Sequence, residues 1–338
     1  MGRRGSQRGE TRTLANRSDQ TESATLAPSP SQSIETVLPE VRERIRFLVE
    51  TAVANGSTIS VSELRSLMPV GQFSSDGVLQ RFLVTDDGLS RSVAEVSGEV
   101  TLPGKEDLAD GRRAQRLLAH SRLSQADDLL QMLESICSWI DLAGISGSTA
   151  YEGAKPEDDL DFYLVTERHR LWISLLLAMA TARLRRIRFR NSPVYCFNRI
   201  VERTDCEQAF RESREPLFAR EALNLVILRG SRLYSHLLAS ARWMETVFPE
   251  LYAMRLREAG AADEATMGRS PAAGTVANAA AFLVLGPYLW LAGIVRNAGL
   301  RRARRDKECF RTVIRPDRYA TESILYDELR EGYRKAFE

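Results

Sequence analysis

Histidine and cysteine are scarce in this chain. It contains 3 histidines and 4 cysteines among 338 residues, and the cysteines are widely spaced without a Cys-x-x-Cys pair. This pattern argues against a zinc ribbon and against a disulfide scaffold. We therefore expect reduced thiols and a cytoplasmic location.

A strong net charge is also lacking. The chain has 47 Lys and Arg against 45 Asp and Glu, a formal net charge of +2. A charge this small gives no whole-protein field that would favour nucleic acid as a partner. The 43% hydrophobic and 27% charged content is ordinary for a soluble globular protein, and the length suits two or three domains.

Residues 1–35 hold almost no large apolar side chains. They are rich in Ser, Thr, Arg, Gln and Pro. Such a segment cannot bury enough surface to offset the entropy of ordering it, so we predict a disordered tail. The segment also lacks the continuous apolar core of a signal peptide, and we expect no secretion.

Residues 36–108 predict a compact module that begins with two helices. Apolar residues recur at helical spacing from Val41 to Ala52. Ser60, with Glu63 three positions later, has the spacing of a capping box and predicts the start of a short second helix.

The second half of this module predicts a third helix and a hairpin. An apolar stretch at 78–84 is followed by a hairpin pattern at 92–102. The order of elements resembles a winged helix-turn-helix. A surface that reads DNA should be basic, yet Asp76, Asp86 and Asp87 surround the third helix. We therefore expect the module to dock a protein or an acceptor, and DNA binding is not favoured.

Two aspartates open a predicted strand near the middle of the chain. Side chains alternate along a strand, so Leu160 would face the core while Asp159 and Asp161 project together from the other face. Adjacent carboxylates repel unless a cation lies between them. A hard divalent ion, Mg²⁺ or Mn²⁺, is the expected ligand of this pair.

Gly147 and Ser148 follow the preceding apolar run. A glycine at the end of a strand lets the backbone approach a ligand closely. If a helix begins there, its free N–H groups and the Ser148 hydroxyl would form a cradle for phosphates.

Together these motifs resemble the signature of the polymerase-beta-like nucleotidyltransferase superfamily, within a poorly characterised prokaryotic branch. The resemblance covers roughly residues 110–250 and places Gly147, Ser148, Asp159 and Asp161 on the motif positions. It implies metal-dependent transfer of a nucleoside monophosphate from a nucleoside triphosphate, such as ATP, to an acceptor, with release of pyrophosphate. Whether the acceptor is a protein, an RNA or a small molecule stays open.

One position departs from the superfamily pattern, which usually adds a third carboxylate from a neighbouring strand. The next predicted strand, 194–201, contains no acid; Asn198 lies at its middle and Glu202 follows its end. Either Glu202 reaches the metal, or Asn198 orients water or substrate, or the acceptor loses its proton without a dedicated base. In a fourth reading the site binds a nucleotide without transferring it, and the chain is a regulatory protein acting through residues 36–108.

Arginines follow the aspartate strand. A helix predicted at 167–186 begins with Arg168, His169 and Arg170, although cations oppose the dipole at a helix N-terminus. We therefore take Arg170 as a candidate contact to the triphosphate. The arginine-rich run 183–190 predicts a solvated face, with a phosphate-rich acceptor such as RNA as the alternative.

The C-terminal part is predicted to be helical, with helices at 216–228 and 231–247 and a flexible linker at 260–274. Residues 276–295 carry no charge and are long enough to cross a bilayer, and arginines follow them. A buried helix pair broken at Pro287 explains the same segment. Membrane association through 276–295 thus stays an open alternative.

The fold class that follows is α+β. We expect a disordered tail at 1–35, a winged-helix-like module at 36–108, a nucleotidyltransferase catalytic domain on a small mixed sheet at 109–215, and a helical C-terminal region at 216–338.

Overall fold

The computed structural model describes residues 30–190, 192–260 and 274–338. The chain divides into two compact units, Met1–Leu38 and Pro39–Glu338. Residues 1–29 of the predicted tail lie outside the described residues, and the helix α1 (Pro30–Ala54) begins at Pro30. The linker predicted at 260–274 also falls almost entirely outside them.

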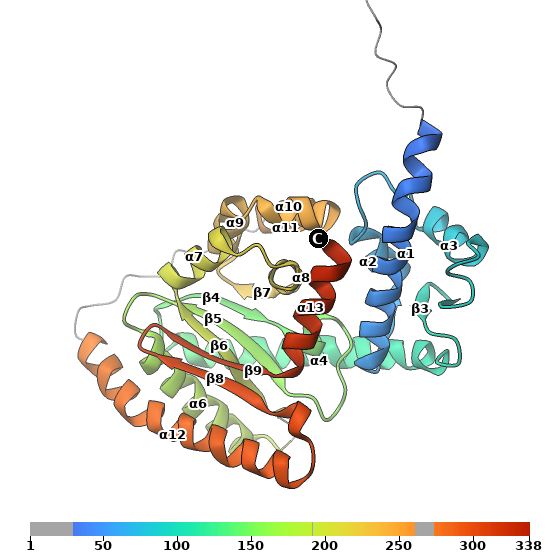
Figure 1. The fold of residues 1–338 in the computed structure, drawn as a ribbon. Coiled ribbons are helices and arrows are strands. Elements are labelled where there is room, and N and C mark those ends of the chain that lie inside the picture. Colours follow the sequence, from blue (N-terminus) through green and yellow to red (C-terminus); the bar gives the residue numbers. More distant parts are fainter. Residues whose placement is uncertain (1–29, 191, 261–273) are drawn as a thin grey trace, which may run out of the picture. The chain divides into compact units, whose positions relative to one another are not determined.

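The described residues form a mixed α+β fold with 13 α-helices and two sheets, one of them mixed (Figure 1). The smaller sheet belongs to the N-terminal module and has the strand order β1-β3-β2. Its elements are α1, β1 (Ile59–Ser60), α2 (Val61–Ser66), α3 (Asp76–Thr85), β2 (Ala94–Val96) and β3 (Glu99–Thr101).

Both local predictions for this module are confirmed. The Ser60 side chain caps α2 by accepting a hydrogen bond from the Glu63 N–H at 3.1 Å. Strands β2 and β3 form the expected hairpin, and its two turn residues, Ser97 and Gly98, both have positive φ. The Ser60 cap and the turn residues therefore act locally, as short-range signals should, whereas the Glu63 side chain pairs with Arg220 instead of completing a capping box.

The larger sheet has six strands in the order β7-β4-β5-β6-β9-β8. Strands β5 and β6 pair in parallel, and the other described pairings in this sheet are antiparallel. The crossover between the parallel strands is the helix α6 (Leu171–Arg188). The strands are β4 (Ile140–Ile145), β5 (Leu160–Thr166), β6 (Tyr195–Glu202), β7 (Val226–Arg229), β8 (Phe310–Arg315) and β9 (Arg318–Ser323).

Helices cover both faces of this sheet (Figure 1). On one face lie α4 (Asp107–Glu134), α6 and α12 (Gly274–Arg302). On the other face are α7 (Arg203–Glu212), α8 (Pro216–Asn224), α9 (Ser231–Ser240) and α13 (Leu325–Phe337). The remaining helical elements are α5 (Gly147–Ala150), α10 (Trp243–Val247), α11 (Pro249–Gly260) and the short 3₁₀ turn η1 (Asp306–Glu308).

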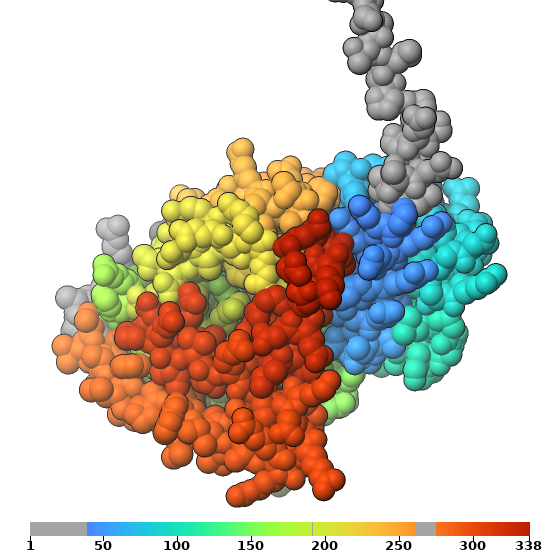
Figure 2. Space-filling view, in the orientation of Figure 1, coloured from blue at the N-terminus to red at the C-terminus, as the bar shows by residue number. Residues whose placement is uncertain are grey.

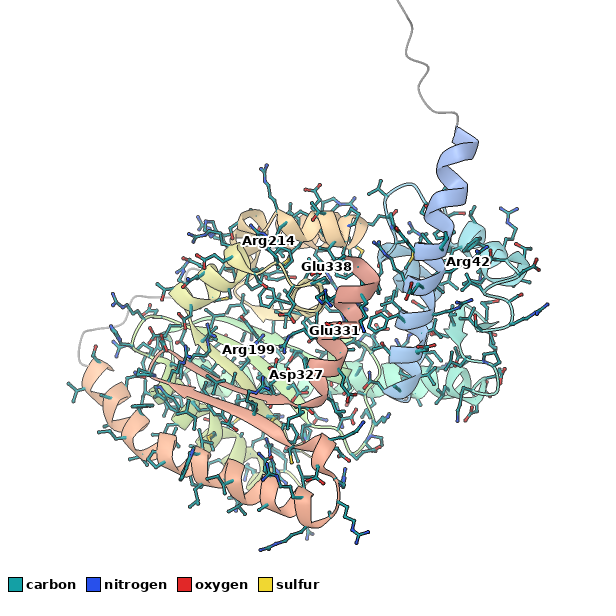
Figure 3. All side chains as sticks on the ribbon, viewed as in Figure 1. Arg42, Arg199, Arg214, Asp327, Glu331 and Glu338 are labelled. Atoms are coloured by element: carbon teal, nitrogen blue, oxygen red, sulfur yellow. The ribbon has the colours of Figure 1, made fainter. Side chains whose placement is uncertain are left out.

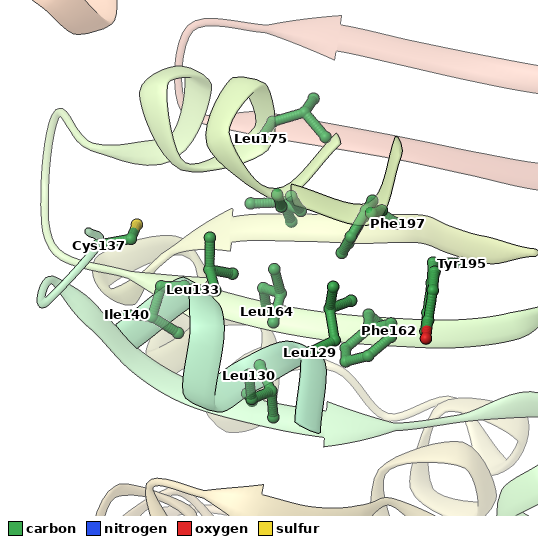
Figure 4. Close-up of a cluster of buried hydrophobic side chains, with 14 of the residues drawn as sticks. Leu129, Leu130, Leu133, Cys137, Ile140, Phe162, Leu164, Leu175, Tyr195 and Phe197 are labelled. Atoms are coloured by element: carbon green, nitrogen blue, oxygen red, sulfur yellow. The ribbon is translucent and has the colours of Figure 1, made fainter. Parts of the chain in front are cut away.

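The main core lies between the sheet and the α4/α6 layer (Figure 4). Leu160, Phe162 and Leu164, the residues predicted to face the core, are all fully buried in it. Phe162 packs against Phe197 of the neighbouring strand, with ring centroids 5.3 Å apart. The alternation read from the sequence is therefore correct, and it leaves Asp161 on the opposite face.

The prediction that residues 216–338 are helical is wrong in part, because this region supplies β7, β8 and β9 to the large sheet. The helix expected at 216–228 ends at Asn224, and the helix expected at 231–247 is split into α9 and α10. A run of four or five apolar residues is ambiguous between helix and strand, and pairing with β4 decides for the strand β7.

The break expected at Pro287 is also absent from the structure, because α12 continues through this residue. A proline removes one main-chain hydrogen bond from a helix and commonly kinks it. Here tertiary contacts hold the helix on both sides of Pro287: Trp172 of α6 packs on Phe282, and Asn297 hydrogen-bonds to Phe310 of β8. Tertiary packing thus overrides the local signal.

Candidate functional site

Gly147 and Asp161 lie in contact at one end of β4 and β5. The antiparallel register pairs Ile145 with Phe162, and the Ser146 N–H donates to the Asp161 carbonyl at 3.0 Å. Gly147 has φ +64°, and a Cβ at this position would collide with Asp161 Oδ2. Both the backbone angle and the close approach therefore require glycine here.

Among the residues that the structure describes, no Lys, Arg or His side chain forms an ion pair with the Asp161 carboxylate. Burial, together with the negative charges of Asp159, Asp158 and Glu221, raises the pKa of Asp161 to about 7. A hydrogen bond from Asn198 acts in the opposite direction. A bound cation or a proton would reduce the electrostatic repulsion among these carboxylates.

Asp159 lies exposed immediately before β5. Partial desolvation and the neighbouring Asp158 raise the pKa of Asp159, while the more distant guanidinium groups of Arg122, Arg186 and Arg296 lower it. Among the residues that the structure describes, no three His, Cys, Asp or Glu side chains gather into a metal-binding group. The pair alone still fits Mg²⁺, which commonly takes one or two carboxylates and completes its shell with water and phosphate.

Asn198 lies beside Asp161, where β6 carries a register irregularity opposite β5. Its Nδ2 donates to Asp161 Oδ1, while its Oδ1 accepts from Thr321 Oγ1 at 3.1 Å and from Cys196 Sγ at 2.8 Å. These contacts fix the orientation of the amide. Of the roles considered from the sequence, orientation fits best, although what Asn198 orients is the Asp161 carboxylate.

Arg170 and Glu202 lie at the opposite end of the same strands. Glu202 pairs with Thr166 at the far end of β5, about 20 Å along the strand from Leu160. It accepts a hydrogen bond from the His169 N–H at 2.7 Å. Arg170 is buried with its guanidinium over the Trp139 ring at 5.4 Å. The structure therefore places Arg170 and Glu202 at the end of the strand opposite Asp161, and it does not bring these two predicted site residues together with the aspartates.

Glu221 of α8 is the acid that the sequence did not reveal. Tyr151 Oη donates to Glu221 Oε1 at 3.0 Å, burial raises the pKa of Glu221, and its charge acts on Asp161. It follows Asp161 by 60 positions on a helix of another region, so no spacing rule connects the two. Only the tertiary packing that sets α8 beside Tyr151 brings Glu221 to the site.

Two cavities meet at this point and share Gly147, Glu221 and Tyr326 as lining residues. The first, of about 440 Å³, also contacts the N-terminal module and is lined by Glu63, Ser148, Lys155 and Arg220, among others. The second, of about 370 Å³, lies over the sheet face and is lined by Asp161, Asn198, Arg199, Arg318 and Arg330, among others. Figure 3 shows Arg199 on this face of the sheet, near α13.

Buried polar contacts hold the N-terminal module against the loop between β4 and β5. Arg112 donates to Ser57 Oγ at 2.9 Å and to the Tyr151 carbonyl at 3.0 Å. Arg220 pairs with Glu63 of α2 and lies over the Tyr151 ring at 4.9 Å. The module therefore forms one wall of the first cavity and positions the loop that leads to Asp159.

No family model, curated protein sequence or solved structure matches this chain.

Proposed function

We propose that the chain is a metal-dependent nucleotidyltransferase that moves a nucleoside monophosphate from a nucleoside triphosphate to an acceptor. The observation that supports this most directly is the partly buried Asp161 carboxylate, which lies near three other acids and packs against a glycine of positive φ where two cavities meet. A carboxylate in that state favours a cation, and a polyphosphate is the substrate that such a cation most often accompanies.

Asp159 and Asp161 would hold Mg²⁺ or Mn²⁺, whose charge would compensate the phosphates and favour attack at the α-phosphorus. Gly147 would allow the triphosphate to approach the backbone, and Ser148 lines the first cavity beside it. Cationic side chains lie in both cavities: Lys155 and Arg220 in the first, and Arg199, Arg318 and Arg330 in the second. Two adjoining cavities suit two substrates, the nucleotide and the acceptor.

In the proposed step an acceptor oxygen forms a bond to the α-phosphorus as the bond to the bridging oxygen of pyrophosphate breaks. The proton of the acceptor hydroxyl needs a base. Glu221 is the best-placed group, because it lies at the junction of the cavities and burial raises its pKa. Asn198 would keep Asp161 oriented through its hydrogen bond.

The N-terminal module also has a role in the proposed function. Its order of helices and hairpin resembles a winged helix, and its Glu63 lines the first cavity. We assign it to docking the acceptor or a partner protein, since the wall it forms faces the proposed site.

A regulatory nucleotide-binding protein is the second candidate. Asn198 favours it, because this amide stands beside Asp161 where the superfamily usually places a third carboxylate. In that case Asn198→Asp would create transfer activity that the wild-type chain lacks, while in the first case wild type is already active.

The test is label transfer from each α-labelled nucleoside triphosphate, with Mg²⁺ or Mn²⁺, to protein, RNA and small-molecule acceptors. Asp159→Ala/Asp161→Ala is compared with Glu157→Ala, which removes an exposed acid from the same loop. We expect pyrophosphate release and label transfer that the double variant loses and Glu157→Ala keeps.

Two other results are informative. If calorimetry showed metal-dependent triphosphate binding but no label was transferred, the regulatory nucleotide-binding protein would be favoured over the enzyme. Absence of triphosphate binding would reject the nucleotide site altogether.

A further inference from the structure

The helix α12 has one face that belongs to the core. Asn278, Ala281 and Leu285 are buried, and Phe282 packs on Trp172 of α6 with ring centroids 4.9 Å apart. Asn278 Oδ1 accepts hydrogen bonds from the main-chain N–H groups of Trp172 and Ile173 at 2.7 and 3.1 Å. The helix thereby caps the start of α6, whose first N–H groups have no partner inside their own helix.

The same helix is also attached near its other end. Asn297 Nδ2 donates to the Phe310 carbonyl at 2.8 Å, and the Phe310 N–H returns a hydrogen bond to Asn297 Oδ1 at 2.9 Å. A bilayer-spanning α12 would break both sets of contacts and uncover the fully buried Trp172. The packing therefore opposes the spanning arrangement that length alone permits.

The outer face of α12 is apolar and exposed, unlike the polar outer face of an ordinary surface helix. Among the described residues, Thr275–Arg302 is the one helix long and apolar enough to cross a membrane, yet only 22% of its most apolar window is buried. From Gly274 to Val295 it contains no charged residue. The exposed large residues are Val276, Leu283, Val284, Tyr288, Trp290, Leu291, Ile294 and Val295.

A basic cluster lies at the C-terminal end of this face. Arg301, Arg302 and Arg304 are exposed there. The end of α6 adds Arg186 and Arg188, since α6 and α12 run side by side from the Trp172–Asn278 contact onward. In Figures 1 and 2 α12, in orange, lies on the outside of the sheet with its surface open. An apolar face that ends in arginines is complementary to an anionic lipid surface.

We propose that α12 binds in the plane of an anionic membrane surface, with its outer face in the interfacial region and the arginines on the lipid phosphates. Trp290 and Tyr288 support a bilayer as the occupant, because amphipathic aromatic side chains favour the membrane interface. A second copy of the chain would bring an identical basic end without matching acids in α12.

The experiment is flotation of the full chain with vesicles of phosphatidylcholine alone and of phosphatidylcholine mixed with phosphatidylglycerol. We expect binding to the mixed vesicles only, reduced by salt and released by alkaline carbonate. Leu283→Glu/Leu291→Glu should abolish flotation. Arg301→Gln/Arg302→Gln/Arg304→Gln should lower the partition coefficient by roughly a hundredfold, because each arginine near an anionic surface contributes to binding.

Val84→Glu/Leu117→Glu is the matched control, since these residues are each 64% exposed on other helices. The control should float like wild type, and circular dichroism should show every variant folded. Quenching of Trp290 fluorescence by brominated lipid, lost in Trp290→Phe, would place the outer face at the interface.

Three results would overturn the proposal. Retention in the membrane after carbonate treatment would mean a spanning helix. A dimer in solution that Leu283→Glu/Leu291→Glu dissociates, without vesicle binding, would make a second copy the occupant. A monomer that binds neither kind of vesicle would leave the face without a lipid role.

Discussion

The parallel strands β5 and β6 hold charged side chains at both ends, and the two ends differ in how those charges are compensated. At the end that begins with Asp161 and Asn198, acids gather beside two cavities, and among the described residues no cationic side chain forms an ion pair with Asp161. At the end formed by Arg170 and Glu202, the carboxylate accepts a main-chain N–H and the guanidinium lies on Trp139. Neither residue lines the two cavities.

The charged groups at one end have partners within the protein, whereas those at the other end are available to bind a ligand. Burying an ion is costly unless the protein itself supplies partners. Arg170 and Glu202 have such partners within the protein. Asp161 accepts a hydrogen bond from the Asn198 amide, and three nearby acids raise its pKa, so we assign it to binding. We call the end with Arg170 and Glu202 the closed end, and the end with Asp161 and Asn198 the open end.

The largest expected effect is on catalysis. Asp161→Asn removes a proposed metal ligand at the open end and should lower nucleotidyl transfer by about 1,000-fold or more. Glu202→Gln changes a carboxylate at the closed end and should keep transfer within about threefold, because Glu202 is far from the cavities. Initial rates with an α-labelled triphosphate measure both. Equal losses of transfer rate in the two variants would show that the two ends of the strands do not differ in their importance for catalysis.

The next effect is on stability, with opposite signs at the two ends. Arg170→Ala leaves a cavity over Trp139 and should lower the free energy of unfolding by roughly 3 kcal/mol. Asp161→Asn relieves buried repulsion and should raise it by roughly 1–2 kcal/mol at neutral pH without divalent ions. Urea unfolding measures both, and added Mg²⁺ should stabilise wild type but not Asp161→Asn. Destabilisation by Asp161→Asn would show that this carboxylate is compensated.

Substitution of Gly147 measures how much space the backbone leaves beside Asp161 at the open end. Gly147→Ala places a Cβ against Asp161 Oδ2 at a left-handed backbone angle and should cost about 2 kcal/mol of stability. Gly98→Ala is the control: Gly98 also has positive φ, but a Cβ there meets nothing within 4 Å, so it should cost about 1 kcal/mol. Thermal melts compare the two. Triphosphate binding should weaken in Gly147→Ala alone, and unchanged binding would mean that the backbone approach is not needed.

The smallest expected effect is the pH dependence of the closed end. Burial raises the pKa of Glu202, so the folded state holds this proton more tightly than the unfolded state. The resulting stabilisation is present below the ordinary glutamate pKa of about 4.3 and is lost as the pH rises through the raised value. Glu202→Gln should therefore gain stability relative to wild type between acidic and neutral pH, as measured by urea unfolding. A constant difference across this range would mean that the pKa is ordinary.

Local features were predictable because their causes are short-range. The cap of α2 depends on residues three positions apart, and the burial of Leu160, Phe162 and Leu164 follows from the alternation of a strand. The same alternation predicted that Asp161 would leave the core face. Failures occurred where distant segments decide the structure, as in β7, which an apolar run alone does not distinguish from a helix.

The sequence by itself determined the spacing of Gly147 and Asp161, the amphipathic elements around them and the uncharged stretch that becomes α12. Only the tertiary structure decided which distant groups join this site. Parallel pairing of β5 and β6 places Asn198 beside Asp161 and places Glu202 at the opposite end of the strand. The packing of α8 brings Glu221 near Asp161. The reason is physical: periodicity specifies which face of an element is buried, whereas its partners and register are selected by long-range packing of the whole core.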